Sequence, residues 1–295
     1  MCAPRRGRIL AGRAAILRLL PLSRREITGH PRMLLPWERK KRGSAREALS
    51  PRELWTGFLR GGYPEMVTGA RRNFTLWHAS YVETYLARDV RALRQVGSLS
   101  QVQVCLRTIA ARSAQLLNLS SLARDLGIAV NTVKAWLSVL EASYQIILLR
   151  PHFANVGKRL VKAPKVYFSD VGTLCYLTGL RDPEHAAAGP MAGAILETAA
   201  LAEIHRTLTH RGEEPRLSFW RTSTGEEVDI LVERAQEIIP LEVKRSSTPR
   251  PAMAAGIASL RRALGARVGC GFVVHPGDVR LPLGAGAEAL PFASL

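Results

Sequence analysis

Two short apolar segments, residues 227–233 and 237–244, constrain the fold more than any other feature of the sequence. Both are rich in Val, Ile and Leu, which favour β-strands. If the two residues Ala235 and Gln236 form the loop between them, the segments pair as a hairpin with a fixed register. The facing pairs are then Val232 with Ile239, Ile230 with Leu241, and Asp229 with Glu242.

This register separates apolar from charged side chains, because side chains alternate between the two faces of a strand. The residues expected on one face are Val228, Ile230, Val232, Ile239, Leu241 and Val243, and those on the other are Asp229, Glu242 and Lys244. An Asp opposite a Glu is normally avoided, because like charges repel across a strand pair. A divalent cation, Mg²⁺ or Mn²⁺, would remove the repulsion, since carboxylate oxygens suit these ions.

Asp229, Glu242 and Lys244 together predict phosphodiester cleavage, in which Lys244 stabilises charge in the transition state or positions a water molecule. Glu197 joins them, because it lies on the apolar stripe of a predicted helix over 193–210, where an unpaired carboxylate is costly. Glu197, Asp229 and Glu242 are thus candidate metal ligands, and with Lys244 they form the candidate catalytic group. In the alternative interpretation, Glu197 forms a salt bridge with Lys244 or Arg221, and the other carboxylates are surface residues.

Residues 118–140 have the layout of a helix-turn-helix. Ser120 or Ser121 would cap the first helix, Gly127 would form the turn, and the second helix would bury Val133 and Trp136. Strands over 144–150 and 165–168 would follow around a basic loop, as in a winged helix. The candidate nucleic-acid contacts are Asn131, Thr132 and Lys134 on the second helix and Lys158, Arg159 and Lys162 in the loop. A winged helix used only for packing is the alternative.

The rest of the chain alternates helices and strands. We expect helices over 72–94, 101–117, 193–210 and 252–264, a short helix after Ser23, and strands over 8–22, 216–221, 227–233, 237–244 and 268–274. This order predicts a mixed α/β fold, with a winged-helix-like helical region followed by an α/β domain.

The net charge of +18 is unevenly distributed. Residues 1–72 have 17 Lys and Arg against 5 Asp and Glu, residues 73–180 have 12 against 5, and residues 181–295 have 13 against 14. Such an excess over the first 180 residues favours a nucleic-acid partner. In the alternative interpretation it reflects a GC-rich coding sequence, since 35 of the 42 basic residues are Arg.

No apolar run approaches the roughly 20 residues that a membrane helix requires, so we expect no membrane partner. The basic start has no small-residue cleavage site after it, and we expect a cytoplasmic protein. The four cysteines are far apart, which excludes a zinc knuckle and a disulfide framework and predicts buried positions for all but Cys2.

Several motifs resemble a large family of prokaryotic AAA-type ATP-binding proteins. They are Gly61-Gly62-Tyr63-Pro64-Glu65, the run from Tyr81 to Val90, the run from Asn118 to Ala123, the run from Gly157 to Gly172, Phe219-Trp220-Arg221 and Glu227-Val228-Asp229. The resemblance extends from residue 8 to about residue 275. It implies a C-terminal domain of unknown function similar to the PD-(D/E)xK nuclease fold, in which Glu197, Asp229, Glu242 and Lys244 match the nuclease-like positions.

In that family an ATPase domain precedes the stretch that matches residues 11–15. This sequence has no G-x-x-x-x-G-K-[ST] loop, so we expect no ATP binding by this chain. We therefore divide it into an ATPase remnant (1–28), a basic linker (29–60), a helical and winged-helix region (61–180) and a nuclease-like domain (181–295). The expected partners are nucleic acid and an ATPase, either as a separate chain or as a missing N-terminal domain; the sequence does not define the oligomeric state.

Overall fold

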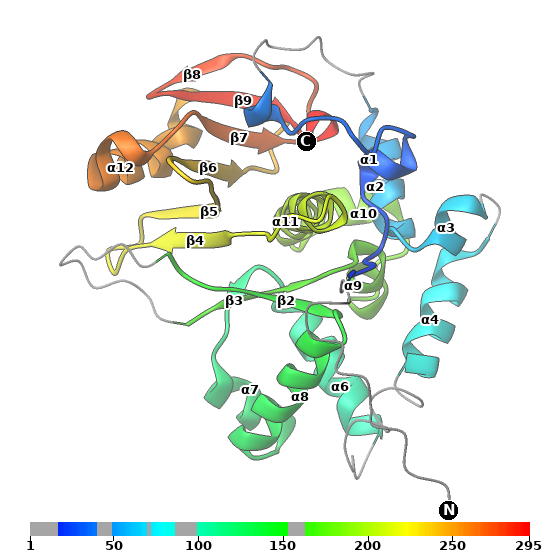
Figure 1. The fold of residues 1–295 in the computed structure, drawn as a ribbon. Helices are drawn as coiled ribbons and strands as arrows, with labels where there is room; N and C mark the ends of the chain where they lie inside the picture. Colours follow the sequence, from blue (N-terminus) through cyan, green and yellow to red (C-terminus); the bar gives the residue numbers. More distant parts are fainter. Residues whose placement is uncertain (1–16, 40–48, 70–71, 86–98, 153–162) are drawn as a thin grey trace, which may run out of the picture.

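A long central helix, α11 (Ala192–His210), lies between two β-sheets and organises the fold (Figure 1). The computed structural model describes residues 17–39, 49–69, 72–85, 99–152 and 163–295. Of the 19 residues of α11, 13 are buried, as expected for a helix that is covered on all sides. The mixed α/β fold predicted from the sequence is confirmed.

The larger sheet has six strands in the order β4-β5-β6-β7-β9-β8. The strands are β4 (Leu217–Arg221), β5 (Glu227–Glu233), β6 (Ile238–Val243), β7 (Gly271–His275), β8 (Pro282–Gly284) and β9 (Ala287–Pro291). β6, β7 and β9 are parallel, and the other neighbours are antiparallel. Helix α11 packs on one face, and α12 (Ala255–Leu264) packs on the other between the short helices η3 (Pro251–Ala254) and η4 (Gly265–Arg267).

The predicted register of the β5–β6 hairpin is confirmed: Ile230 pairs with Leu241 and Val232 with Ile239. The other side of β5 departs from the prediction. Two residues of β5, Asp229 and Ile230, lie opposite the single residue Phe219 of β4, which is a β-bulge. The bulge reverses the alternation of side chains, so Val228 does not share the face of Ile230 as predicted but packs with the residues under α12.

The smaller sheet belongs to a winged helix. Its elements are α6 (Leu99–Ala110), β1 (Gln115–Leu116), α7 (Leu119–Leu126), α8 (Val130–Ala142), β2 (Ile146–Leu149) and β3 (Lys165–Phe168). The strands pair antiparallel in the order β1-β3-β2. Gly127 forms the turn, as predicted, with a left-handed φ of 62°. The cap differs from the prediction, because the side chain of Asn118, and not Ser120 or Ser121, accepts the N–H of Ser121 (2.9 Å).

The segment expected to be a strand and a linker is partly helical. Residues 17–22 form no strand, whereas Ser23 caps α1 (Arg24–Ile27) as expected. After the 3₁₀ turn η1 (Pro36–Glu38), helix α2 (Pro51–Arg60) replaces the end of the predicted linker. Ser50 and Glu53 form a capping box that starts α2, and its apolar face is buried.

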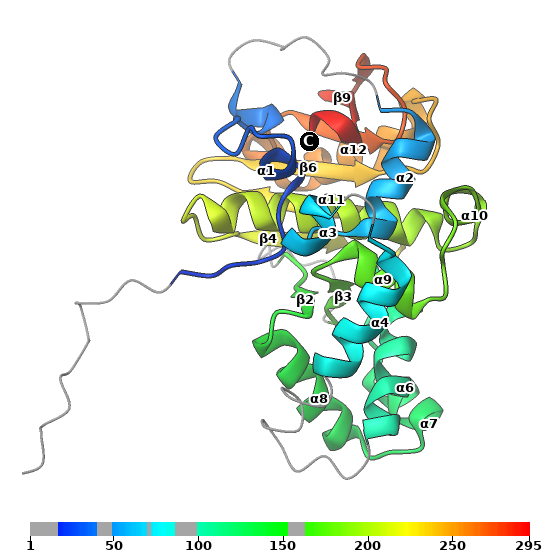
Figure 2. The same cartoon turned by 90° about the vertical axis from the view of Figure 1, so that its right-hand side faces the viewer.

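The remaining helices join the two sheets. They are α3 (Pro64–Thr68), α4 (Phe74–Tyr85), α9 (Val171–Leu177), α10 (Pro183–Ala188) and η5 (Phe292–Ser294). Residues 86–94 of the helix predicted over 72–94 lie outside the described residues. Figure 2 shows α4, α6, α7 and α8 in one lobe below α11 and the larger sheet. One apolar core nevertheless extends from α8 through α11 to β7.

None of the helices in the described ranges is long and apolar enough to cross a membrane. Cys105 and Cys175 are buried as predicted, whereas Cys270 is exposed.

Candidate functional site

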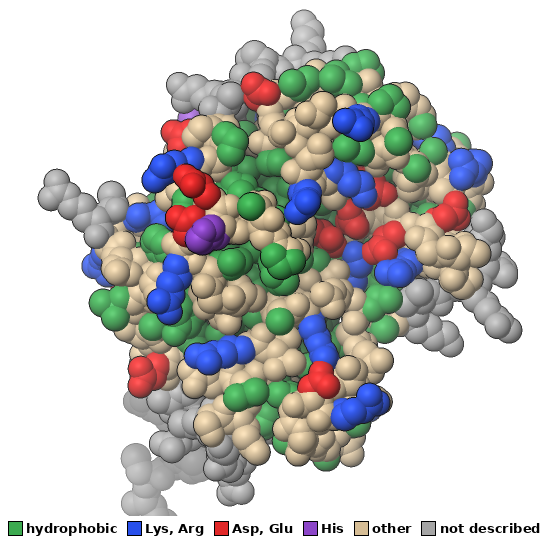
Figure 3. Space-filling model, turned by 180° about the vertical axis from the view of Figure 1, so that it is seen from behind, with side chains coloured by type: hydrophobic (Ala, Val, Ile, Leu, Met, Phe, Trp, Pro, Cys, Tyr) green, Lys and Arg blue, Asp and Glu red, His purple; other side chains and the backbone are tan. Residues whose placement is uncertain are grey.

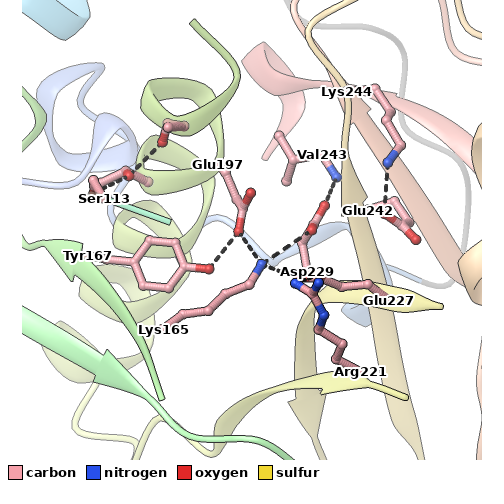
Figure 4. A network of polar contacts seen from close by, with 12 residues as sticks. Ser113, Lys165, Tyr167, Glu197, Arg221, Glu227, Asp229, Glu242, Val243 and Lys244 are labelled. Atoms are coloured by element: carbon pink, nitrogen blue, oxygen red, sulfur yellow. Dashed lines mark hydrogen bonds and ion pairs between the residues drawn. The ribbon is translucent and has the colours of Figure 1, made fainter. Parts of the chain in front are cut away.

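A pocket of about 450 Å³ lies where the winged-helix sheet meets the larger sheet and α11 (Figure 4). Its charged side chains come from four different elements: β3, α11, β4 and β5. The lining residues are Ala114, Gln115, Leu116, Lys165, Glu197, Arg221, Glu227 and Asp229. Glu197 and Asp229, predicted from the sequence to converge, do lie together here.

The ammonium group of Lys165 occupies the centre of the carboxylates. Its Nζ lies 2.5 Å from Glu227 Oε1, 2.9 Å from Glu197 Oε1 and 3.6 Å from Asp229 Oδ1. Only 4% of the Lys165 side chain is exposed. Burial opposes the charge of Lys165, but the three carboxylates outweigh burial and raise its pKa above the usual value, so the side chain stays an ammonium ion.

Two further side chains hold the carboxylates in place. The hydroxyl of Tyr167 donates a hydrogen bond to Glu197 Oε1 (2.6 Å), and Arg221 forms an ion pair with Glu227 (2.9 Å). Tyr167 is fully buried, and burial together with the charge of Glu197 raises its pKa well above the usual value. The phenol therefore remains protonated and remains a donor to Glu197.

The β-bulge directs Asp229 to the α11 side of the sheet. There Asp229 Oδ1 faces Lys165, while Oδ2 accepts the backbone N–H of Val243 (2.8 Å). Glu242 lies on the α12 side, against Gly256, and bonds Lys244 (3.1 Å). The carboxyl groups of Asp229 and Glu242 still contact each other, and Asp229 lies near enough to raise the pKa of Lys244. The three predicted site residues therefore lie near one another, and the bulge lets Asp229 face Lys165 as well.

Asp229 acts electrostatically on both glutamates. Burial, and then the negative charge of Asp229, raises the pKa of Glu197 to about 7 and that of Glu242 to about 8. Burial opposes the charge of Lys244, but the nearby carboxylates, Glu242 first and then Asp229, outweigh burial and raise the pKa of Lys244. Near neutral pH, protons on the glutamates and the three cations Lys165, Arg221 and Lys244 balance most of the acidic charge.

The carboxylates, as they lie, do not fit a bound divalent cation. Glu197 is engaged by Lys165 and Tyr167, Asp229 by Lys165 and a backbone N–H, and Glu242 by Lys244. In the part of the chain that the structure describes, no three His, Cys, Asp or Glu side chains are grouped to hold a metal ion. The proposed Mg²⁺ or Mn²⁺ site stays a prediction, and it requires Lys165 to move.

The predicted nucleic-acid contacts are only partly described. On α8, Asn131 and Lys134 are exposed and Thr132 is half-buried, so the first turns of this helix are accessible. The loop residues Lys158, Arg159 and Lys162 lie outside the described residues. Figure 3 shows that basic side chains are spread over the back of the molecule with acidic ones among them.

Sequence reasoning missed Lys165, Tyr167 and Glu227 as members of the site. A signal was present: Lys165 starts a strand whose four residues are all buried, and a lysine in such a strand requires a carboxylate partner. The proposed salt bridge of Glu197 with Lys244 or Arg221 is wrong, because Lys165 takes that place.

Two stretches of the chain match families whose function is not known. Residues 51–184 carry a domain of unknown function (DUF8612), and residues 192–295 carry another (DUF4143). No solved structure matches the chain.

The chain is also similar to uncharacterised proteins of two mycobacteria. Rv2008c of Mycobacterium tuberculosis and Mb2031c of Mycobacterium bovis are each 31% identical to it over 241 residues, which is 81% of this chain and 52% of the relative. The chain thus spans about half the length of these relatives. The comparisons establish domains of unknown function and a distant relationship, without an assignment to AAA-type ATPases or to nucleases.

Proposed function

We propose that this chain is a nucleic-acid-associated regulatory module, and that Lys165 closes its nuclease-like pocket to metal so that the pocket is not catalytic. The position of the Lys165 ammonium group among Glu197, Glu227 and Asp229 carries this proposal. A buried cation that lies 2.5–3.6 Å from the three carboxylates supplies the charge that a metal would otherwise supply. A second cation at the same point would meet strong repulsion.

The link between the pocket and the winged helix supports a regulatory role. Lys165 is the first residue of β3, the central strand of the winged-helix sheet, and its ion pairs reach α11 and β5. A displacement of the winged helix would therefore move Lys165 in the pocket through the single strand β3. The resemblance to AAA-type proteins, and the length of the mycobacterial relatives, make an ATPase the partner that we propose for this module.

Metal titration of a lysine variant tests the proposal. Lys165→Met keeps the approximate length of the side chain and removes its charge, so Glu197 and Asp229 lose their cation while Glu227 keeps its ion pair with Arg221. We expect a loss of about 3–5 kcal/mol in the free energy of unfolding. Mn²⁺ should then raise the Tm of the variant by about 4 °C at roughly a hundredfold excess over Kd. The Tm of the unmodified chain should not change.

Lys244→Met is the matched control, since it removes a more exposed lysine whose ion pair among the described residues is with Glu242. It should leave the chain insensitive to Mn²⁺. The proposal is abandoned if the unmodified chain gains thermal stability with Mg²⁺ or Mn²⁺ and cleaves plasmid or single-stranded DNA.

A metal-dependent phosphodiesterase is the second candidate function. One observation favours it: the charge of Asp229 raises the pKa of both Glu197 and Glu242, which is the repulsion that a divalent cation relieves. In this case Asp229, Glu242 and Glu197 are the proposed metal ligands, and Lys244 is the proposed catalytic cation. Asp229→Asn should then abolish both the metal-dependent rise in Tm and DNA cleavage, whereas Lys244→Ala should abolish cleavage alone.

Nucleic-acid binding is tested separately on α8. Asn131→Ala with Lys134→Ala should weaken the binding of duplex DNA, and affinity should fall steeply with salt, because contacts to phosphates release counterions. Lys158→Ala with Arg159→Ala tests the loop in the same way. Arg52→Ala is the control, since this exposed residue lies on α2 and pairs with Glu184. Equal affinity of all these variants in a gel-shift series would leave the winged helix with a packing role.

A further inference from the structure

A second cavity, of about 230 Å³, lies between α1, α2 and α11 and is separate from the lysine pocket. Its walls are largely apolar. The side chains that form them are Leu22, Ile27, Leu54, Phe58, Val171 and Phe292, which come from segments far apart in the sequence. The volume lies slightly below the usual range of small-molecule sites, about 300–1,000 Å³, so it suits a small ligand.

Two buried charged residues of α11 line the same cavity. Glu203 is 4% exposed and Arg206 is 6% exposed. Glu203 Oε2 accepts the backbone N–H of Arg24 (2.8 Å), whereas its Oε1 is buried and accepts no hydrogen bond from any residue described. Arg206 donates to the backbone carbonyls of Leu22 (2.7 Å) and Ala202 (3.1 Å).

Neither charge is neutralised by an ion pair. Across the described ranges, Glu203 forms no salt bridge with a basic side chain and Arg206 forms none with an acidic one. A buried charge is costly unless a charge of opposite sign lies beside it. Glu203 and Arg206 are three residues apart on one helix, so their Cβ atoms are about 5–6 Å apart. The cavity thus presents these two buried charges of α11 at neighbouring points beside an apolar space, while the less buried Arg24 and Glu53 also line it.

We propose that this cavity binds a free amino acid with an apolar side chain. Its ammonium group would lie at Glu203, its carboxylate at Arg206, and its side chain against the apolar walls. A ligand with a single charge would leave one buried residue uncompensated, whereas a zwitterion compensates both. The adjacent ammonium and carboxylate groups of an α-amino acid match the spacing of one helical turn.

Saturation-transfer NMR on the full chain tests the proposal with L-leucine and L-phenylalanine as probes. The matched analogues of leucine are 3-methylbutylamine, which lacks the carboxylate, and 4-methylpentanoate, which lacks the ammonium group. We expect leucine to bind with a Kd at least about tenfold lower than either analogue, because each analogue loses one charge-assisted contact. Glu203→Gln should remove this preference over 4-methylpentanoate.

Gly57→Leu provides a variant that keeps both charged residues. Gly57 lines the cavity from within α2, and a Cβ there would meet no atom within 4 Å. The side chain introduced by Gly57→Leu can therefore occupy the cavity without a collision at the backbone. This variant should fold, and saturation transfer to free L-leucine should be lost. Absence of transfer to leucine in the unmodified chain, equal transfer in Gly57→Leu, or equal affinity for leucine and an analogue would each overturn the proposal.

Discussion

At the scale of single residues, several charged side chains are buried, where desolvation costs free energy, and the opposite charges beside them compensate this cost to different extents. Lys165 is compensated by three carboxylates, whereas Glu242 has one lysine beside it and the negative Asp229 nearby. The pKa of Glu242 therefore rises, while Lys165 keeps its charge. Proton uptake by Glu242 relieves the repulsion, so its contribution to stability must depend on pH.

Glu242 should make the folded state less stable as pH rises. Its folded pKa of about 8 lies above the usual unfolded value of about 4.3, so the folded state binds the additional proton between these values. The stabilisation is complete below the unfolded pKa and is lost as pH rises through the folded pKa. Relative to the unmodified chain, Glu242→Gln should gain about 3–4 kcal/mol between pH 5 and pH 9.

Urea denaturation of both proteins across this pH range measures the difference, and groups common to both cancel. A constant difference between the two proteins at every pH would contradict the raised pKa of Glu242.

The structure gives a physical reason for the glycine that ends the motif from Gly157 to Gly172, which in the sequence was only a resemblance to other proteins. The Gly61-Gly62 turn, Asp170 and Gly172 meet where α2, α4 and α9 converge, and Asp170 accepts the N–H of Gly62 (2.7 Å). A Cβ at Gly172 would collide with His78 Nε2 and lie 2.8 Å from Gly61 N. The glycine is thus required by close packing.

Gly172→Ala should accordingly destabilise the chain by about 1–3 kcal/mol, because the fully buried His78 must move. Gly193→Ala is the control in α11, where a Cβ would meet no atom within 4 Å. It should instead gain about 0.5–1 kcal/mol from the better helix propensity of alanine. Thermal or urea denaturation compares the two; a Gly172→Ala protein as stable as the unmodified chain would show that the junction adapts without strain.

At the scale of elements, local capping chemistry decides where the helix-turn-helix begins. The sequence offers Asn118, Ser120 and Ser121 within four residues, and all are residue types that cap helices. The structure uses Asn118, because α7 starts at Leu119 and the backbone of Asn118 is extended. The two serines then belong to the first turn of the helix.

Alanine substitutions distinguish these caps. Asn118→Ala should destabilise the chain by about 1 kcal/mol, since the N–H of Ser121 loses its acceptor. Ser120→Ala should change the free energy of unfolding by less than about 0.5 kcal/mol or increase it, because alanine is the better helix former. The opposite ranking in urea denaturation would place the cap at Ser120, as the sequence suggested.

At the scale of the whole molecule, the winged helix and the larger sheet share one core. Leu137 of α8, Leu201 of α11 and Leu241 of β6 belong to the same continuous apolar cluster. Backbone hydrogen bonds also join β4 to the end of β2, where His152 donates to the carbonyl of Phe219 (2.7 Å). The two regions therefore cannot separate without exposing buried apolar surface.

We expect a single cooperative unfolding transition as a result. The calorimetric and van't Hoff enthalpies of unfolding should agree, and amides of α8, α11 and β6 should share the slowest class of hydrogen exchange. Two resolved calorimetric transitions, with α8 exchanging ahead of β6, would show that the winged helix unfolds independently.

Short-range patterns in the sequence were sufficient for much of the fold. Alternation of apolar residues specified the β5–β6 register, and helical periodicity with Gly127 specified the helix-turn-helix, because both depend on residues only a few positions apart. The same patterns identified Glu197 and Asp229 as neighbours in space. The strands β8 and β9 were missed, since Pro282–Gly284 is very short and Ala287–Pro291 lacks alternation.

The sequence by itself determined the mixed α/β class and the proximity of Glu197 to Asp229. Only the tertiary structure decided which cation pairs with these carboxylates. The β-bulge opposite Phe219 directs Asp229 to the α11 side of the sheet, and β3 brings Lys165 between the carboxylates from a segment 64 residues before Asp229. Neither effect has a local pattern, because a bulge depends on the neighbouring strand and an ion pair depends on packing between sheets.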